Sequence, residues 1–186
     1  MTVLRVDSSI RYEGSVSREL TAKLAGDDAV HRDLAAMRGL EEAWREAVLG
    51  EPGPLVAELA DEVAAADAIV VGVPVYDLGI PAVVKSWLGL VIADPRFNPR
   101  TALGSALAGV PVTLVAMALR REAPRPGAVV GRRVGGWWYG PGSPVEGWNH
   151  AIPYLRRMFA DVFGADVTLE VVEGTVQNAA RPQAPV

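Results

Sequence analysis

The turn that follows the first apolar run of the chain constrains the fold more than any other feature. Residues 3–6 have the length of a strand, and Leu20 and Leu24 have the spacing of one helix face. The turn between them holds three serines: Ser9, Ser15 and Ser17. A strand that opens through such a turn into a helix directs backbone N–H groups and the helix dipole toward one point, where a phosphate can bind. In the simpler alternative, Ser15 or Ser17 only caps the helix.

Strands and helices alternate about five times along the chain. The other predicted strands are 29–31, 68–73, 109–116 and 167–172, and the other predicted helices lie at 40–49, 54–63, 81–91 and 144–162. Segment 68–73 is apolar throughout, which is typical of a parallel strand that is covered on both faces. The pattern predicts an α/β fold of the flavodoxin-like type, with a five-stranded parallel sheet in the order 2-1-3-4-5 and helices on both faces.

The same fold rule predicts where a ligand binds. In this strand order the ligand lies outside the carboxyl ends of strands 1 and 3, where the direction of the connections reverses. The serine turn follows strand 1, and the turn 74–81, which begins and ends with proline, follows strand 3. The position of both turns therefore favours the phosphate site over simple helix capping.

Composition excludes several classes of function. The 186 residues include no cysteine, so disulfides, cysteine nucleophiles and thiolate metal sites are excluded. His31 and His150 lie far apart in the sequence, so no metal site is predicted. The net charge of −4 argues against binding to nucleic acid or to an anionic membrane surface. No basic, apolar leader and no membrane-spanning run stands out, so we expect a cytoplasmic protein.

The segment 118–142 is a long predicted loop rich in arginine, tryptophan and glycine, and loops of this length are usually functional. Ser143 to Glu146 has the pattern of a capping box, which predicts that the last helix begins at Pro144. The predicted domain spans residues 1–175, and the tail 176–186, rich in proline, alanine and glutamine, is predicted to be flexible.

At five places the chain resembles the FMN-dependent azoreductase and NAD(P)H:quinone oxidoreductase family. The segments that carry the resemblance are 8–20, 31–35, 73–87, Arg133 with Gly135, Gly136 and Tyr139, and 153–174. Each segment alone is weak, whereas their order and spacing together are specific. The resemblance covers roughly residues 3 to 175.

The resemblance implies FMN as the cofactor and gives site residues for it. The hydroxyls of Ser9, Ser15 and Ser17 and the amide of Val16 would hold the phosphate. The residues that would line the isoalloxazine ring are Pro74, Val75, Tyr76, Asp77, Gly135 and Gly136. Tyr76 and Asp77 are the candidate catalytic residues. The family also implies a homodimer whose active site lies at the interface, and Phe97 is a candidate to cover the flavin of the partner.

The activity implied by the resemblance is hydride transfer from NADH or NADPH through the flavin to a quinone, azo or related small aromatic acceptor, in a ping-pong cycle. Asp77 departs from the family pattern, because asparagine usually stands there and an ionised carboxylate can only accept hydrogen bonds. Asp77 therefore points elsewhere, or weakens the flavin site, or indicates a flavin-free descendant that catalyses a lyase- or cyclase-type step in the same pocket. A small electron carrier is a third alternative, although such carriers are usually more acidic than this chain.

Overall fold

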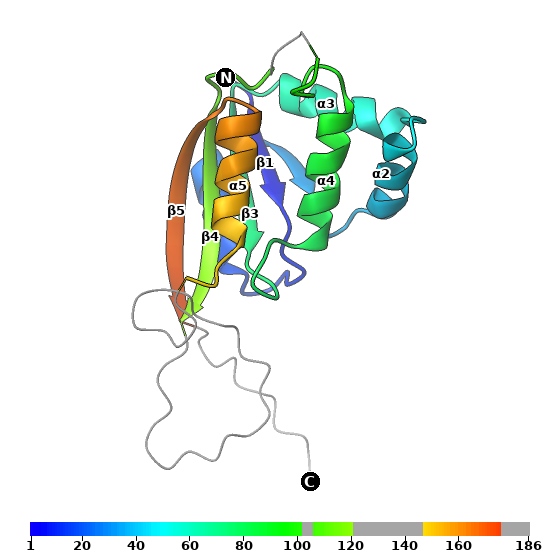
Figure 1. Cartoon of the computed structure of the whole chain (residues 1–186). Coiled ribbons are helices and arrows are strands. Elements are labelled where there is room, and N and C mark those ends of the chain that lie inside the picture. Colours follow the sequence, from blue (N-terminus) through cyan, green and yellow to red (C-terminus); the bar gives the residue numbers. More distant parts are fainter. Residues whose placement is uncertain (102–105, 121–146, 176–186) are drawn as a thin grey trace.

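The structure is a computed structural model that describes residues 1–101, 106–120 and 147–175 of the 186-residue chain. Five parallel strands form one sheet in the order β2-β1-β3-β4-β5 (Figure 1). The strands are β1 Val3–Asp7, β2 Val30–Asp33, β3 Ala68–Pro74, β4 Pro111–Arg120 and β5 Asp166–Thr175. The predicted fold class and strand order are confirmed.

Helices cover both faces of this sheet, as predicted (Figure 1). They are α1 Val16–Ala25, α2 Leu40–Val48, α3 Pro54–Ala64, α4 Ala82–Ala93, α5 Ala151–Arg156 and the π-helix η1 Arg157–Val162, which continues α5. The connection from β1 to β2 runs in the opposite direction along the sheet from all later connections. Since parallel crossovers are right-handed, α1 falls on one face, and α3, α4 and α5 fall on the other.

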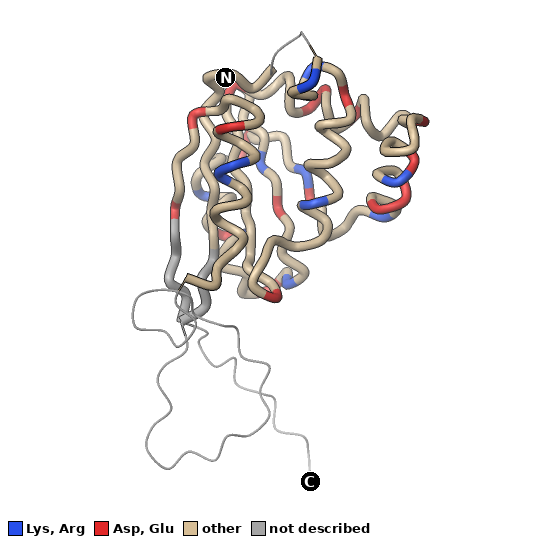
Figure 2. Tube along the Cα trace, in the orientation of Figure 1, with Lys and Arg blue, Asp and Glu red and all other residues tan. Residues whose placement is uncertain are grey.

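The hydrophobic core lies between the sheet and the layer of α3, α4, α5 and η1. Alternate strand residues point into it, and the central members are fully buried: Leu4, Val6, Ile69, Val71, Val73, Val112 and Leu114. From the helices, Trp87 and Phe159 pack against each other with ring centroids 6.4 Å apart. Figure 2 shows that charged residues gather on the outer helix α2, whereas β3 carries none. The charge distribution thus matches a sheet that is buried at its centre.

The opposite face of the sheet, under α1, is polar where β1 passes beneath the helix. Asp7 is only 1% exposed, and its carboxylate accepts a hydrogen bond from the Thr21 hydroxyl of α1 at 2.7 Å. Arg5 lies 2.7 Å from the same carboxylate, and Nε2 of His31 lies 2.9 Å from it. We call Asp7 with these three partners the Asp7 cluster. It attaches α1 to β1 and β2 through charge and hydrogen bonds.

Gly72 allows this helix to approach the sheet closely. A Cβ at this position would lie 2.9 Å from Thr21 Cγ2 and 3.0 Å from Asp7 Oδ1. Gly72→Ala is therefore expected to lower the free energy of unfolding by about 1 to 3 kcal/mol, the usual cost of overpacking. Urea unfolding of the purified variant measures this change.

The double variant Gly72→Ala/Thr21→Ser is the matched control, because serine keeps the hydroxyl and lacks the clashing methyl group. We expect the second substitution to recover part of the lost stability. Equal stability of Gly72→Ala and the wild type would show that the approach of α1 to β3 is not limiting.

The last helix begins later than the sequence pattern predicted. Residues 147–150 are not helical, and α5 begins at Ala151, whereas the predicted start was Pro144. Gly147 has φ of +80°, which interrupts a helix, and the Asn149 side chain accepts hydrogen bonds from the N–H groups of Ala151 and Ile152. The expected capping box at 143–146 lies outside the described residues.

The π-helix η1 changes which residues of this segment face the core. Phe159 and Phe163, four residues apart, are both fully buried, whereas Val162 is only half-buried. The wider turn of a π-helix shifts the inward face by one position. Phe97 packs edge-on against Phe163, with ring centroids 6.2 Å apart and no exposed surface. The prediction that Phe97 covers a flavin of the partner is therefore wrong.

Strands β4 and β5 both run further than predicted, to Arg120 and Thr175. Within the described ranges, none of the helices is long and apolar enough to cross a bilayer. The predicted loop 121–142 and the tail 176–186 lie outside the described residues.

Candidate functional site

The loops that follow β1 and β3 lie side by side at the carboxyl edge of the sheet. We call residues 8–15 the serine loop and residues 75–81 the ring loop. The hydroxyl of Ser8 donates a hydrogen bond of 2.7 Å to the Gly72 carbonyl, and the Ile10 N–H donates one of 3.3 Å to the Tyr76 hydroxyl. The strand order therefore brings both predicted site segments together, because β1 and β3 are neighbours.

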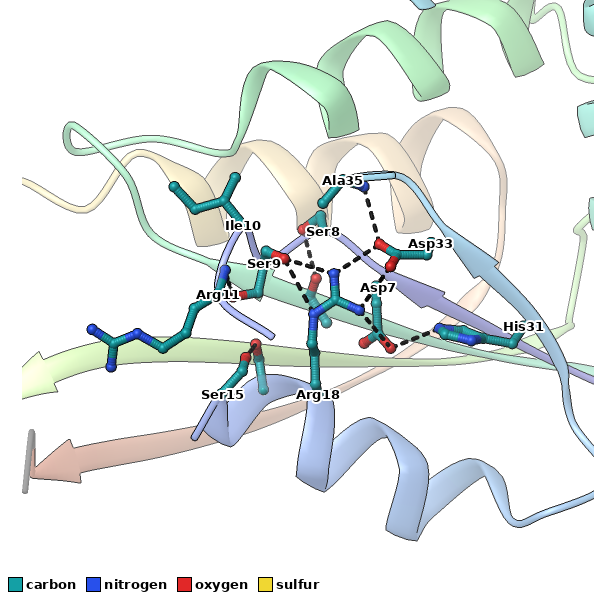
Figure 3. Close-up of polar contacts among 12 residues, drawn as sticks. Asp7, Ser8, Ser9, Ile10, Arg11, Ser15, Arg18, His31, Asp33 and Ala35 are labelled. Carbon is teal, nitrogen blue, oxygen red and sulfur yellow. Dashed lines mark hydrogen bonds and ion pairs between the residues drawn. The ribbon is translucent and has the colours of Figure 1, made fainter. Parts of the chain in front are cut away.

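Three buried serines surround the N-terminus of α1, as predicted. Ser9, Ser15 and Ser17 are 4%, 6% and 3% exposed. Ser15 stands at the N-cap position but makes no side-chain cap hydrogen bond, so the capping alternative is wrong for Ser15. Instead, its Oγ lies 3.3 Å from Oγ of Ser17 (Figure 3).

The hydrogen-bonding capacity of these serines is incompletely used within the described part of the chain. One hydroxyl proton of the Ser15–Ser17 pair has no acceptor there, since only one of the two can donate to the other. Ser9 Oγ accepts the Arg11 N–H at 3.2 Å, which leaves its own proton free to donate (Figure 3). The backbone amides of the first helical turn, including that of Val16, have no acceptor within the helix. These donors form a cradle for an anionic group.

The ring loop contains a tight turn with backbone strain. Asp77 and Leu78 have φ of +47° and +70°, and reciprocal backbone hydrogen bonds of 3.0 and 2.8 Å close the turn between Tyr76 and Gly79. Two consecutive positive φ values define a type I′ turn, which normally takes Asn-Gly. Strain of this kind is typical of segments whose backbone groups contact a ligand. The Leu78 carbonyl accepts the His150 N–H at 2.9 Å, which holds the turn against the start of α5.

The four predicted ring-lining residues of this loop differ in exposure. Pro74 ends β3 and is buried, Val75 and Tyr76 are half-buried, and Asp77 is exposed. Asp77 makes no hydrogen bond or ion pair with any other described residue. Its carboxylate therefore projects from the tip of the ring loop. Gly135 and Gly136, the other two predicted contacts, lie outside the described residues, as do Trp137 and Trp138.

A second group of charged residues beneath the serine loop was missed by the sequence analysis. Arg18, the first residue after the serine pattern, binds Asp33 at the end of β2 with two hydrogen bonds of 2.7 and 3.0 Å (Figure 3). The same guanidinium donates to the Ser9 carbonyl at 2.6 and 3.1 Å. Local sequence patterns gave no signal for this pair, because Arg18 lies in α1 and Asp33 lies at the end of β2.

The environment of Asp33 favours its ionised form. Burial opposes ionisation, but the hydrogen bonds and charge of Arg18, with the Ala35 N–H, outweigh it and hold the pKa of Asp33 below its usual value of 3.8. A carboxyl group whose pKa is lower in the folded state stabilises the fold above the unfolded value. That contribution is lost as the pH falls through the lowered pKa.

The stability difference between the wild type and Asp33→Asn is therefore expected to depend on pH. Near neutral pH we expect a difference of about 1.5 to 3 kcal/mol, the usual contribution of hydrogen bonds to a charged group. The difference should shrink progressively below pH 3.8, because the wild-type carboxyl becomes neutral as well. Urea unfolding of both proteins across this range measures it. A difference that persists unchanged at the lowest pH would contradict the assignment.

Comparisons with known proteins agree with this geometry. A family model described as a flavodoxin-like fold matches residues 1–185. An FMN-dependent NADH:quinone oxidoreductase from Parafrankia sp. is 32% identical to the chain, over 88% of this chain and 79% of its own length. Another, from Methylobacterium radiotolerans, is 34% identical over 86% of this chain and 81% of its own length.

The fold is also that of solved enzymes. The crystal structure of an azoreductase from Bacillus anthracis has a TM-score of 0.62 and 24% identity, over 93% of this chain and 86% of that chain. At 24% sequence identity, this similarity shows a shared fold and nothing about a shared activity. Together with the 32% identity to the relative from Parafrankia, the match over residues 1–185 confirms the resemblance seen in the sequence. The chain belongs to the flavodoxin-like fold family that includes the FMN-dependent NADH:quinone oxidoreductases.

Proposed function

We propose that this protein is an FMN-dependent oxidoreductase that uses NADH to reduce a quinone, azo or related small aromatic acceptor. The observation that carries the proposal is the cradle of buried serines at the N-terminus of α1, beside the strained ring loop. A second support is that relatives matching most of the chain, at 32% and 34% identity, are FMN-dependent NADH:quinone oxidoreductases.

The cradle suits the phosphate of FMN. Buried hydroxyls with free protons can donate to phosphate oxygens, and the positive end of the α1 dipole favours a dianion. Ser9, Ser15 and Ser17, with the amide of Val16, are the residues assigned to it. A neutral ligand would leave these donors without strong acceptors in a buried site, which is costly.

The ring loop is assigned to the isoalloxazine ring. Pro74, Val75 and Tyr76 are assigned to line the ring. The hydrogen bonds that close the strained turn do not use the backbone N–H groups of Asp77 and Leu78, so these groups are assigned as donors to the ring. The Tyr76 hydroxyl accepts the Ile10 N–H, which sets the spacing between the ring loop and the serine loop. Gly135 and Gly136 are assigned to the pyrimidine end of the ring from the resemblance alone.

The redox chemistry in this proposal comes from bound FMN, which alternates between NADH and the acceptor in a ping-pong cycle. The protein's own residues are assigned to binding and orienting NADH and the acceptor at the same site. Asp77 presents an exposed carboxyl group, bound to no other described residue, at the tip of the ring loop. A negative charge there would repel a reduced, anionic ring more than an oxidised one. We therefore assign Asp77 to tuning the reduction potential, and Tyr76 to positioning the ring loop.

The protein is further proposed to act as a cytoplasmic homodimer whose site lies at the interface, built on a single domain of residues 1–175. Two apolar side chains of the serine loop support an interface at this edge. Ile10 and Tyr12 are 73% and 60% exposed, although they lie beside the proposed cofactor site. A partner subunit would cover them and enclose the pocket.

The first experiment is the visible absorbance of the purified protein, followed by FMN titration if it is colourless. A yellow protein that NADH bleaches without oxygen, and that a quinone recolours, supports the proposal. Asp77→Asn should raise the midpoint potential of the bound flavin in a spectroelectrochemical titration, because the substitution removes a negative charge beside the proposed position of the ring.

The flavin-free lyase or cyclase remains the second candidate, and the exposed Asp77 carboxylate is the observation that favours it. In that case the protein stays colourless at saturating FMN. Asp77 then becomes the first residue to test as a general acid or base.

A further inference from the structure

We propose that the ion pair between Arg18 and Asp33 is a positioning device that holds the serine loop in the shape needed for the FMN phosphate. The inference rests on the proposed function and adds two residues to it. Neither residue belongs to the serine cradle or to the ring loop.

Arg18 joins three segments of the chain through one guanidinium group (Figure 3). It projects from the first turn of α1 and binds both carboxylate oxygens of Asp33, at 2.7 and 3.0 Å, at the end of β2. Through Nε and Nη2 it also donates to the Ser9 carbonyl, at 3.1 and 2.6 Å. The planar fork of arginine fits such a bidentate arrangement, and lysine cannot reproduce it.

A second contact fixes the other side of the serine loop. The guanidinium carbon of Arg18 lies 4.4 Å above the centroid of the Tyr12 ring, within the range of a cation–π interaction. The loop is therefore attached to Arg18 at both Ser9 and Tyr12. Asp33 in turn is oriented by the Ala35 N–H, which donates to its Oδ1 at 3.1 Å.

The geometry indicates that Arg18 acts through the loop and not by touching the phosphate. All three of its guanidinium nitrogens already donate to Asp33 or to the Ser9 carbonyl, and its side chain is only 11% exposed. Its positive charge is paired with Asp33, and the Asp7 carboxylate lies 3.9 Å away. The group is thus neutralised locally, whereas the Ser9 backbone that it holds carries a hydroxyl of the cradle.

Asp33→Asn distinguishes a positioning role of Arg18 from direct electrostatic attraction of the phosphate, because the two roles predict opposite changes in the affinity for FMN. The substitution removes a negative charge near the phosphate, so an electrostatic role of Arg18 predicts tighter FMN binding. A positioning role predicts weaker binding, because asparagine offers one acceptor and places an amide group against the guanidinium. We expect the dissociation constant for FMN to rise about tenfold or more, the equivalent of one charge-assisted hydrogen bond.

The experiment measures the affinity of wild type, Asp33→Asn and Arg18→Lys for FMN and for riboflavin, which lacks the phosphate, by quenching of flavin fluorescence. Weaker FMN binding with unchanged riboflavin binding supports the proposal. Arg96→Lys is the matched control, since Arg96 also forms a bidentate pair with an aspartate, Asp94, in a loop after α4. It should leave both affinities unchanged.

Tighter FMN binding by Asp33→Asn, or an equal loss for FMN and riboflavin, overturns the proposal. Hydrogen exchange of the serine-loop amides in the flavin-free proteins gives a readout that does not depend on the cofactor. Faster exchange in Asp33→Asn supports the positioning role, and unchanged exchange overturns it. A wild-type protein that binds no FMN refutes the proposed function instead, and the exchange result still tests the ion pair.

Discussion

Ser17→Asp is expected to abolish FMN binding while the protein remains folded. The substitution places a carboxylate at the position of Ser17, which is only 3% exposed, close to where the phosphate is proposed to bind. Repulsion between two unit charges about 4 Å apart costs about 4 kcal/mol at the effective dielectric of such a site, which is roughly a thousandfold in affinity. The dipole of α1 interacts favourably with an acidic residue in the first turn, which offsets part of the cost of placing a charge at this buried position. Flavin fluorescence titration measures the affinity, and thermal unfolding confirms that the variant is folded.

Ser17→Asn is the matched control, because asparagine has nearly the shape of aspartate and no charge. We expect it to weaken FMN binding far less than the aspartate variant does. Riboflavin binding should separate the two effects further, since a flavin without a phosphate meets no repulsion from the new carboxylate. Similar FMN affinity for Ser17→Asp and Ser17→Asn would show that the phosphate binds elsewhere.

Asp7→Ala should produce the largest loss of stability among the polar substitutions. Asp7 is 1% exposed, and its removal leaves Arg5 and the Thr21 hydroxyl without their common partner under α1. Breaking a buried ion pair by removing one member typically costs about 3 to 5 kcal/mol, because the remaining charge is buried without compensation. The midpoint and slope of urea unfolding give this value, together with a test of two-state behaviour.

Asp161→Ala provides the control for that measurement. Asp161 also binds an arginine, Arg157, but both side chains are more than half exposed on the surface of the last helix. Exposed pairs of this kind contribute about 0 to 1 kcal/mol. If Asp7→Ala costs no more than Asp161→Ala, the Asp7 cluster does not stabilise the packing of α1.

The order of the strands and the edge of the sheet that carries the candidate site could be predicted from the sequence. Apolar runs such as 68–73, separated by helical spacing, identify buried parallel strands, and right-handed crossovers then leave few possible orders. Ser9, Ser15 and Ser17 were recognisable because a serine turn between a strand and a helix has a direct local geometry. Their burial and their closeness to the ring loop agree with that prediction.

Features that depend on residues distant in sequence could not be predicted in this way. The pairing of Arg18 with Asp33 and the packing of Phe97 against Phe163 require segments to meet across the sheet or the core. Local sequence patterns do not show which residues from distant segments come into contact. The assignment of Phe97 to a partner's flavin came from the family resemblance, and the structure places Phe97 in the core instead.

Backbone conformation at single positions was decided by tertiary structure as well. The positive φ of Leu78 contradicts the local preference of leucine, whereas Asp77 tolerates its positive φ more easily, and the hydrogen bond from the His150 N–H to the Leu78 carbonyl holds the turn in place. The sequence by itself determined the fold class and the edge of the sheet where the ligand is proposed to bind, because periodicity and turn chemistry are local properties. Only the tertiary structure decided the shape of the loops at that edge, because ion pairs and strained turns are maintained by contacts that the completed sheet brings together.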